Sequence, residues 1–176
     1  MFFEKRGEYE LFSHELKKDK SRMSISALSI LDSKGRTVIS RNYRGDIPMN
    51  AVNKFVAKIT EEEEINLCPV LLIQDVTYMY VKHNGLYFMA FTDQNINALL
   101  VVSFLSKLIE VMKMYFSVVT EETIRDNFVV IYELLDEMID YGYPQITETK
   151  VLQGYITQES HRMNMKEVQS LLPAVT

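Results

Sequence analysis

Apolar residues recur at helical spacing along residues 120–145, which form the clearest pattern in the chain. Charged residues occupy the opposite side of the same helix, so the pattern predicts one buried face and one solvated face. Thr120 can accept hydrogen bonds from the first amides, whereas Gly142 and Pro144 favour an end just past the last turn. The residues expected on the buried face are Ile124, Phe128, Ile131, Leu135 and Met138.

Shorter apolar runs near the start of the chain predict a β-hairpin followed by a helix. Residues 25–31 and 36–41 are rich in aliphatic and β-branched side chains, and the turn-forming cluster D-S-K-G separates them. Pro48 stands where a helix can begin, and the apolar residues after it return at helical spacing. These residues are Val52, Phe55, Val56 and Ile59.

Three further apolar segments predict strands at residues 69–74, 76–82 and 86–91. The last two are joined by H-N-G, and Asn-Gly favours a tight hairpin because both residues tolerate a positive φ. Residues 86–91 show no alternation of apolar and polar side chains. Such a strand is expected to be covered on both faces, which requires helices on both sides of the sheet.

A long helix is predicted from a cap at Thr92 or Asp93 to about residue 119. Apolar side chains cover most of its circumference, so we expect it to lie between the sheet and the helix of residues 120–145. A last short helix is indicated near residues 151–156. The polar stripe of the long helix consists of Ser103, Ser106, Lys107, Glu110, Lys113 and Ser117.

The order of these elements predicts the fold class. The links within each group of strands are too short for parallel crossovers, so the strands must pair mostly antiparallel. We expect an α/β (α+β) domain over residues 23–160, with a five-stranded sheet, one helix on one face and two on the other. Half of residues 1–22 are charged, so we read them as an extension of unknown origin that the fold does not need, and residues 161–176 as a linker-like tail.

Composition excludes several classes of protein. The 176 residues are 47% apolar and 24% charged, as in an ordinary soluble domain. A net charge of −5 gives no general electrostatic reason to bind nucleic acid. Cys68 is the single cysteine, so no internal disulfide can form, which fits a reducing compartment. No apolar run approaches the roughly 18 residues of a membrane span, so any action at a membrane would be from its surface.

One long string in residues 120–145 allows a comparison with a known family. I-R-D-N-F-V-V-I-Y-E-L-L-D-E-M-I-D-Y-G-Y-P-Q resembles the N-terminal domain of the medium (mu) chains of clathrin adaptor complexes. The resemblance begins at Met23 and extends to about Ser160. It implies a longin fold, whose order of strands and helices is the order predicted above from the hydrophobic pattern.

Three other strings bear on the subtype. R-N-Y-R-G-D at residues 41–46, I-R-D-N at 124–127 and L-Q-G-Y-I-T-Q-E at 152–159 look most like the medium chain of the adaptor at the trans-Golgi network and endosomes. D-I at 46–47 and N-A-V at 50–52 are slightly similar to the plasma-membrane counterpart. The plasma-membrane medium chain therefore stays open as an alternative.

The resemblance implies a non-catalytic scaffold in vesicle-mediated protein transport. The domain would pack against a large adaptor chain in a heterotetramer completed by a second large chain and a small chain, meeting clathrin and membrane indirectly. It would lie in the cytoplasm, peripherally on trans-Golgi network and endosomal membranes and on clathrin-coated vesicles. In medium chains a further β-rich domain binds cargo signals. We expect that domain to be absent here, so no residue is assigned to cargo.

Three other identities are considered for the same residues. A small adaptor chain has the same fold. The longin domain of a membrane-fusion protein would be followed by coiled-coil heptads, which residues 161–176 do not supply. A small hydrolase would need a nucleophile beside a positioned base, and no such constellation is recognisable.

Candidate chemistry is sparse, and we expect no catalytic residue, cofactor or metal site. Residues 61–64 are four glutamates, which usually lie solvated at a helix end. Cys68 is expected to be a small buried thiol. R-G-D at 44–46 is expected to form a turn. An exposed apolar patch is expected as the partner interface, without assigned residues. The remaining candidates are Glu133, Asp136, Glu137 and Asp140 on one helix face, and His14, His83 and His161 without zinc spacing.

Overall fold

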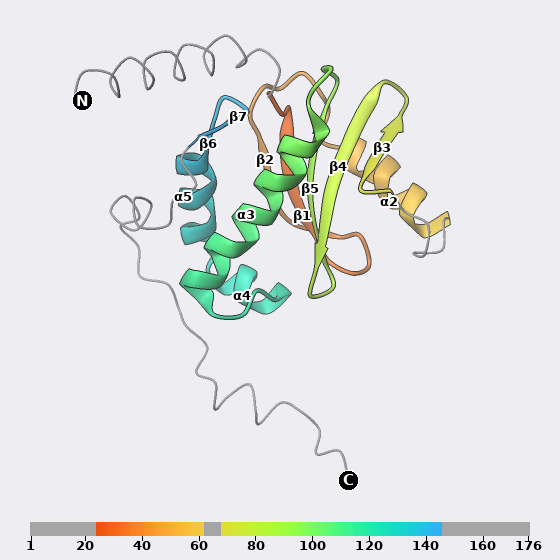
Figure 1. Cartoon of the computed structure of the whole chain (residues 1–176). Helices are drawn as coiled ribbons and strands as arrows, with labels where there is room; N and C mark the ends of the chain where they lie inside the picture. The colour runs from red at the N-terminus through yellow and green to blue at the C-terminus, as the bar shows by residue number, and fades with distance from the viewer. Residues whose placement is uncertain (1–23, 62–67, 146–176) are drawn as a thin grey trace, which may run out of the picture.

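The structure is a computed structural model that describes residues 24–61 and 68–145. Five strands form one antiparallel sheet in the order β2-β1-β5-β4-β3, and helices cover both of its faces (Figure 1). The predicted fold class is therefore confirmed. The strands are β1 (Ala27–Leu31), β2 (Thr37–Asn42), β3 (Val70–Ile73), β4 (Val76–His83) and β5 (Leu86–Thr92). The helices are α2 (Ala51–Glu61), α3 (Ala98–Phe116), α4 (Glu121–Asp126) and α5 (Phe128–Met138).

The two predicted hairpins are confirmed, and the turn residues explain them. Asp32 accepts hydrogen bonds from the backbone amides of Lys34 at 2.9 Å and Arg36 at 2.8 Å, which closes the turn between β1 and β2. Burial alone would raise the pKa of Asp32, but these amides and the Arg36 side chain together hold it below its usual range. Between β4 and β5, Asn84 and Gly85 have φ of 48° and 74°, as a two-residue hairpin requires.

Strand β5 lies at the centre of the sheet, and all seven of its residues are buried. Alternate side chains point to opposite faces, so β5 contributes to two separate cores. Phe88 and Ala90 join the core shared with α3, α4 and α5, whereas Tyr87 and Met89 join the core shared with α2. The absence of polar alternation in the sequence predicted this two-sided burial.

Helix α2 is held on its face of the sheet by an aromatic cluster. Phe55 is fully buried, and its ring centroid lies 5.8 Å from that of Tyr78, 5.2 Å from Tyr80 and 6.3 Å from Tyr87. The Tyr78 hydroxyl donates to the carbonyl oxygen of Ala51 at 3.0 Å, which ties the first turn of α2 to β4. This face is thus closed by one helix, as predicted.

The helix predicted over residues 120–145 is interrupted at Asn127, which is a correction. Thr120 caps α4 as predicted, accepting from the Thr123 amide at 3.2 Å. Asn127 then adopts φ −118° and ψ 25°, and its side-chain amide donates to the Thr123 carbonyl at 2.9 Å. The same carbonyl also accepts from the Asn127 backbone amide at 3.2 Å. The ψ of Asn127 lies outside the helical range, so α4 ends there and α5 starts in a new direction (Figure 1). As a result Phe128, predicted to be buried, is 54% exposed.

The ends of the long helix also differ from the prediction. Thr92, the last residue of β5, and Asp93 both lie too far before Ala98 to cap α3, so that prediction is wrong. Asn97 caps α3 instead, and its side-chain oxygen accepts from the amides of Leu99 at 3.1 Å and Leu100 at 3.4 Å. The helix ends at Phe116 because Ser117 has a φ of 65°. The short helix predicted near residues 151–156 lies outside the described residues.

After α5 the chain forms a hairpin rather than another helical turn. Strands β6 (Ile139–Asp140) and β7 (Tyr143–Pro144) are joined by Tyr141 and Gly142, whose φ angles are 47° and 86°. The Gly142 carbonyl accepts a 2.8 Å hydrogen bond from the Ile25 amide, so the tip of the hairpin is fixed to the start of the described chain. The positive φ predicted for Gly142 is confirmed, although it lies in this turn and not at the helix end.

Candidate interaction surface

The four carboxylates predicted to share a helix face are not gathered into one cluster. Glu133 is partly buried on α5, whereas Asp136, Glu137 and Asp140 are exposed. Asp136 forms an ion pair with Arg41 of β2 at 2.7 Å. Within residues 24–61 and 68–145, no three His, Cys, Asp or Glu side chains are placed to hold a metal ion. The acidic face is therefore a charged surface that contacts β2 and solvent.

The other candidate residues lie apart from one another. Cys68 is exposed, which corrects the predicted burial: it lies before β3, outside the sheet and outside both hydrophobic cores. Arg44 and Asp46 form an ion pair at 2.7 Å in the predicted turn around Gly45. Glu61 ends α2. His14, His161 and residues 62–64 lie outside the described residues.

His83 ends β4, and its Nε2 atom is buried without a hydrogen-bond partner. Burial, with a further contribution from the Lys113 charge, lowers the pKa of His83 below its ordinary value of about 6.5. The unfolded chain therefore binds a proton more readily, and the free energy of unfolding should fall as pH decreases from about 6.5 through the lowered pKa. Above that range the contribution of His83 to stability is complete.

This pH dependence can be measured by urea unfolding at several values between pH 7.5 and 5. We expect His83→Gln, which cannot titrate, to lose less stability over this range than the unsubstituted chain. The Asn84 side chain next to it, which donates to the Val119 carbonyl at 3.1 Å, keeps the hairpin against the end of α3 in both proteins. Equal losses in the two proteins would contradict the assignment to His83.

Seven large apolar side chains are exposed in the described part of the chain, and three of them lie at one end of the helical layer. Met114, in the last turns of α3, is 53% exposed, while Phe128 and Val129, in the first turn of α5, are 54% and 44% exposed. Figure 1 shows the end of α3 and the start of α5 at the same end of this layer, next to α4. We call these three residues the helix-end patch. The others are Leu72, Leu99, Leu100 and Tyr141.

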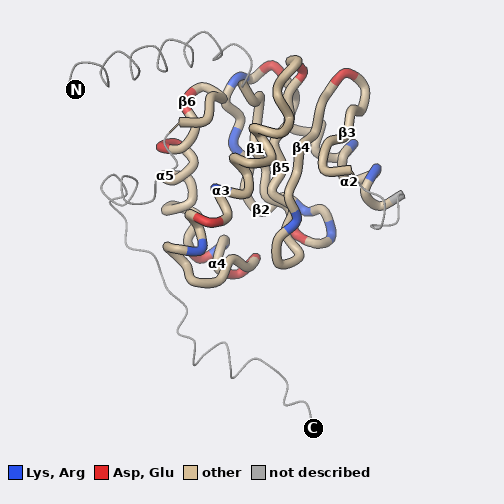
Figure 2. The backbone as a smooth tube through the Cα atoms, in the orientation of Figure 1, with Lys and Arg blue, Asp and Glu red and all other residues tan. Residues whose placement is uncertain are grey.

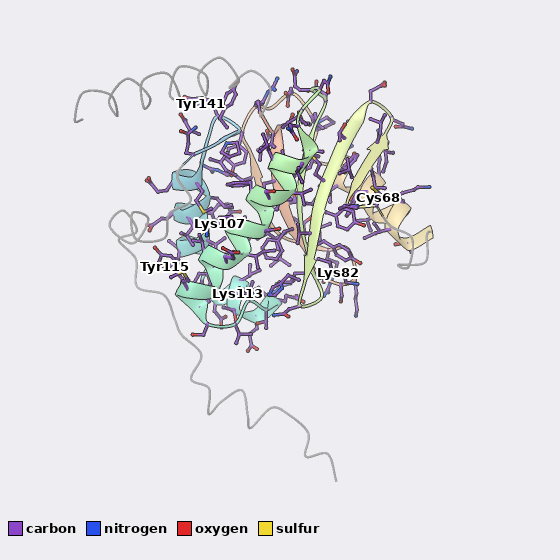
Figure 3. The ribbon with its side chains drawn as sticks, viewed as in Figure 1. Cys68, Lys82, Lys107, Lys113, Tyr115 and Tyr141 are labelled. Carbon is purple, nitrogen blue, oxygen red and sulfur yellow. The ribbon has the colours of Figure 1, made fainter. Side chains whose placement is uncertain are left out.

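A second surface feature is a hollow beside the β6–β7 hairpin. Two adjoining hollows, of about 260 Å³ and about 610 Å³, share Tyr43 and Tyr141 in their walls. Tyr141 is 79% exposed and lies at the tip of the hairpin, outside the layers of the fold (Figure 3). We call the combined feature the tyrosine groove. Its walls are formed by the aromatic residues Tyr43, Tyr141 and Tyr143, by Ser24, and by the charged residues Arg41, Arg44, Asp136 and Asp140.

Some polar groups of the tyrosine groove have hydrogen-bond or ion-pair partners, whereas one hydroxyl has none among the described residues. The Tyr43 hydroxyl is buried and has no hydrogen-bond partner among the described residues; burial raises the pKa of Tyr43, and the charge of Asp136 raises it further. The Arg41 guanidinium pairs with Asp136, and Arg44 pairs with Asp46. The groove therefore offers aromatic walls and a hydroxyl donor, with both nearby arginines already engaged.

Sequence reasoning did not locate either surface. The residues of the groove come from three segments far apart in the chain, and only the fold brings them together. Phe128 was misplaced because the interruption at Asn127 gives no clear signal in the hydrophobic spacing. The one signal in the sequence is Gly142, because a glycine directly after a helix favours a turn and would place Tyr141 at its tip.

Comparison with protein families now decides the relationship. The model of the family described as clathrin adaptor complex small chain matches residues 24–164. The chain belongs to this family. Among the described residues of this family member, no helix has both the length and the apolar character needed to cross a bilayer.

Individual relatives refine the relationship. The chain is 53% identical over 152 residues to "AP-1 complex subunit mu" of Dictyostelium discoideum, which covers 86% of this chain and 36% of the relative. It is 52% identical over 142 residues to "AP-1 complex subunit mu-1-I" of Caenorhabditis elegans and 51% identical over 142 residues to "AP-1 complex subunit mu-2" of Homo sapiens. Each match covers 80% of this chain and 34% of the relative. The resemblance to mu chains is confirmed.

The similarity covers only part of each curated relative, and it extends at the level of the fold to a chain of a full-length AP-3 complex. The chain spans about a third of the length of the curated relatives it matches. A chain of a homology model of the full-length AP-3 complex, in a stretched open conformation, has a TM-score of 0.59 and 14% identity to this one. That match covers 83% of this chain and 94% of the other, and confirms the longin-like adaptor fold.

Proposed function

We propose that this chain is the longin-like domain of a medium subunit in a clathrin-associated adaptor complex. The observation that carries the proposal is about 50% identity to subunits named AP-1 mu over nearly all of the described fold. Such a subunit acts in vesicle-mediated protein transport between the trans-Golgi network and endosomes. Its place is cytoplasmic and peripheral, on those membranes and on clathrin-coated vesicles. The plasma-membrane medium chain and the small chain are less favoured because these relatives are AP-1 mu subunits.

Within that complex the domain is a scaffold without catalytic activity of its own. It binds one large adaptor chain, and a second large chain and a small chain complete the heterotetramer. Clathrin and membrane are reached through the complex, and this domain contacts neither nucleic acid nor cargo signals. Residues 23–160 form the domain, with residues 1–22 an extension and residues 161–176 a linker.

The helix-end patch is our candidate for the contact with the large chain. Met114, Phe128 and Val129 come from two helices and are about half exposed, although the rest of α3 and α5 contributes many fully buried apolar residues. Exposed apolar side chains gathered at one place usually mark a protein contact, and each large side chain buried there contributes about 1.5–3 kcal/mol. The acidic half of α5 lies next to the patch and would form its polar rim.

The experiment is a pull-down of each recombinant large-chain trunk by the folded chain. We expect stoichiometric binding to one trunk, and a loss of about tenfold or more for the double variant Phe128→Asp, Val129→Asp, because charges would be placed in an apolar contact. Leu72→Asp is the matched control: Leu72 is 73% exposed on β3, at the far edge of the sheet. Equal weakening by both variants would remove the patch from the interface.

A further inference from the structure

The tyrosine groove is not accounted for by the proposed scaffold role. Tyr141 occupies a left-handed backbone conformation, with φ 47°, which disfavours a bulky side chain by about 1 kcal/mol or more. The adjacent Gly142 is fixed to Ile25 by a 2.8 Å hydrogen bond, so the turn cannot relax easily. The chain therefore holds a large aromatic side chain in solvent at an energetic cost. Exposed aromatic side chains beside a hollow are typical anchors for a bound segment.

We propose that residues 17–23 of this same chain bind in the tyrosine groove. The described chain begins at Ser24, which forms part of the groove wall. Ser24 is anchored there: its hydroxyl accepts from Arg44 at 3.2 Å, and its carbonyl accepts from the Thr92 hydroxyl at 3.2 Å. The preceding residues must therefore start from the groove. Residues 17–23 can span up to about 25 Å when extended. Asp140, just beyond the end of α5, lines the same hollow as Tyr43 and Tyr141.

Charge complementarity favours this segment as the occupant. Residues 17–22 read K-K-D-K-S-R, with four cations and one acid. Two arginines line the groove, but Arg41 is paired with Asp136 and Arg44 with Asp46, both at 2.7 Å. The exposed Asp140 in the same lining forms no ion pair with any described residue. Figure 2 shows acidic positions along α5 and β6 on this side of the molecule, with basic positions next to them. The segment after the described residues also leaves near Tyr143, but residues 146–160 carry two acids and one base, so they do not complement this surface.

The groove also matches the chemistry of a backbone. The buried Tyr43 hydroxyl lacks a partner among the described residues, and an extended segment presents a carbonyl acceptor about every second residue on one side. The aromatic faces of Tyr141 and Tyr143 can cover the methylene stems of lysine side chains. The matched family begins at residue 24, so this segment is outside the part shared with the family. Binding of residues 17–23 would make the groove a self-covered surface.

Tryptophan fluorescence tests this directly, because the chain contains no tryptophan. In Tyr141→Trp the probe sits in the groove wall, and in the matched control Leu72→Trp it sits on β3, at 73% exposure against 79% for Tyr141. Acrylamide quenching is measured on the full chain and on a chain starting at Met23. A tethered segment has an effective concentration near millimolar. We therefore expect quenching of the Tyr141→Trp probe in the full chain to be about half of that in the chain starting at Met23.

Protection of the Tyr141→Trp probe from quenching should depend on salt and on the basic residues of the segment. The protection should disappear in about 1 M NaCl, where charges are screened within about 3 Å, and in the full chain with K17Q, K18Q, K20Q and R22Q. Quenching of the Leu72→Trp probe should be the same in the full chain, in the truncated chain, in the full chain at about 1 M NaCl and in the full chain with the four glutamine substitutions. The truncated chain should keep its melting temperature, since exposed ion pairs contribute about 1 kcal/mol or less.

Three results would overturn the proposal. One is equal quenching of Tyr141→Trp in the full and truncated chains at low salt. Another is protection that survives both 1 M NaCl and the four glutamine substitutions, because the contact would then not depend on the basic residues. The third is protection that depends on protein concentration in the truncated chain, which would show a second copy in the groove.

Discussion

Gly142→Ala should strongly destabilise the domain. We expect it to cost more than the same substitution at any other glycine in the described β-hairpins. Alanine disfavours a φ of +86° by about 1–2 kcal/mol, and its Cβ would lie 2.1 Å from the carbonyl oxygen of Ile25. The hairpin would have to move away and lose the Ile25–Gly142 hydrogen bond, worth about 1 kcal/mol. We expect a total loss of about 3 kcal/mol or more, and a melting temperature lower by roughly 10 °C.

Gly45→Ala is the matched control for this effect. Gly45 also has a positive φ, of +72°, but a Cβ there would meet no atom within 4 Å. Gly45→Ala should therefore cost only the strain of a left-handed backbone in alanine, about 1–2 kcal/mol. Urea unfolding of both variants separates the two contributions. If Gly142→Ala is no more destabilising than Gly45→Ala, the hairpin is not packed against Ile25 as described.

Phe55→Ala should have the largest effect on the other face of the sheet. Phe55 is fully buried, and its ring contacts those of Tyr78, Tyr80 and Tyr87. Replacing a buried phenylalanine by alanine costs about 3–5 kcal/mol, through lost burial and the cavity left behind. A single helix covers this face, so no second helix can close over the space. We expect α2 to open at a lower free energy than the remaining sheet.

Hydrogen exchange resolved by residue distinguishes this local opening from global unfolding. The amides of α2 should exchange faster in Phe55→Ala than those of β5, whose residues are buried on both faces. Lys54→Ala, at the neighbouring exposed position where Lys54 contacts Gln74 at 2.6 Å, is the control and should change stability by less than about 0.5 kcal/mol. Uniformly faster exchange in α2 and β5 would show that the two faces unfold together.

The hydrophobic pattern predicted the parts of the fold in which local and long-range preferences agree. The unalternating β5 required helices on both faces, and Asn84-Gly85 required a hairpin, and both are present. The pattern failed where one polar side chain outweighs it. Asn127 divides a continuous apolar stripe because its backbone leaves the helical conformation while its side chain donates to the Thr123 carbonyl, and this change of direction exposes Phe128.

The candidate surfaces were less predictable for a different reason. Burial of Cys68 was expected from its residue type, but the residue lies before an edge strand and outside both cores, and the place of that strand depends on strand order. Likewise Ser24, Tyr43 and Tyr141 are neighbours through the pairing of distant segments. The sequence indicates that apolar surface remains for a partner, and the structure is needed to say which residues supply it.

The central claim is that this chain is the scaffold domain of an adaptor medium subunit, and assembly tests it most directly. The measurement is the mass, by light scattering after size exclusion, of the species formed when the chain is co-expressed with both large-chain trunks and a small chain of an AP-1 complex. We predict one species containing one copy of each of the four chains. A folded chain that elutes alone, while the other three assemble without it, would contradict the claim.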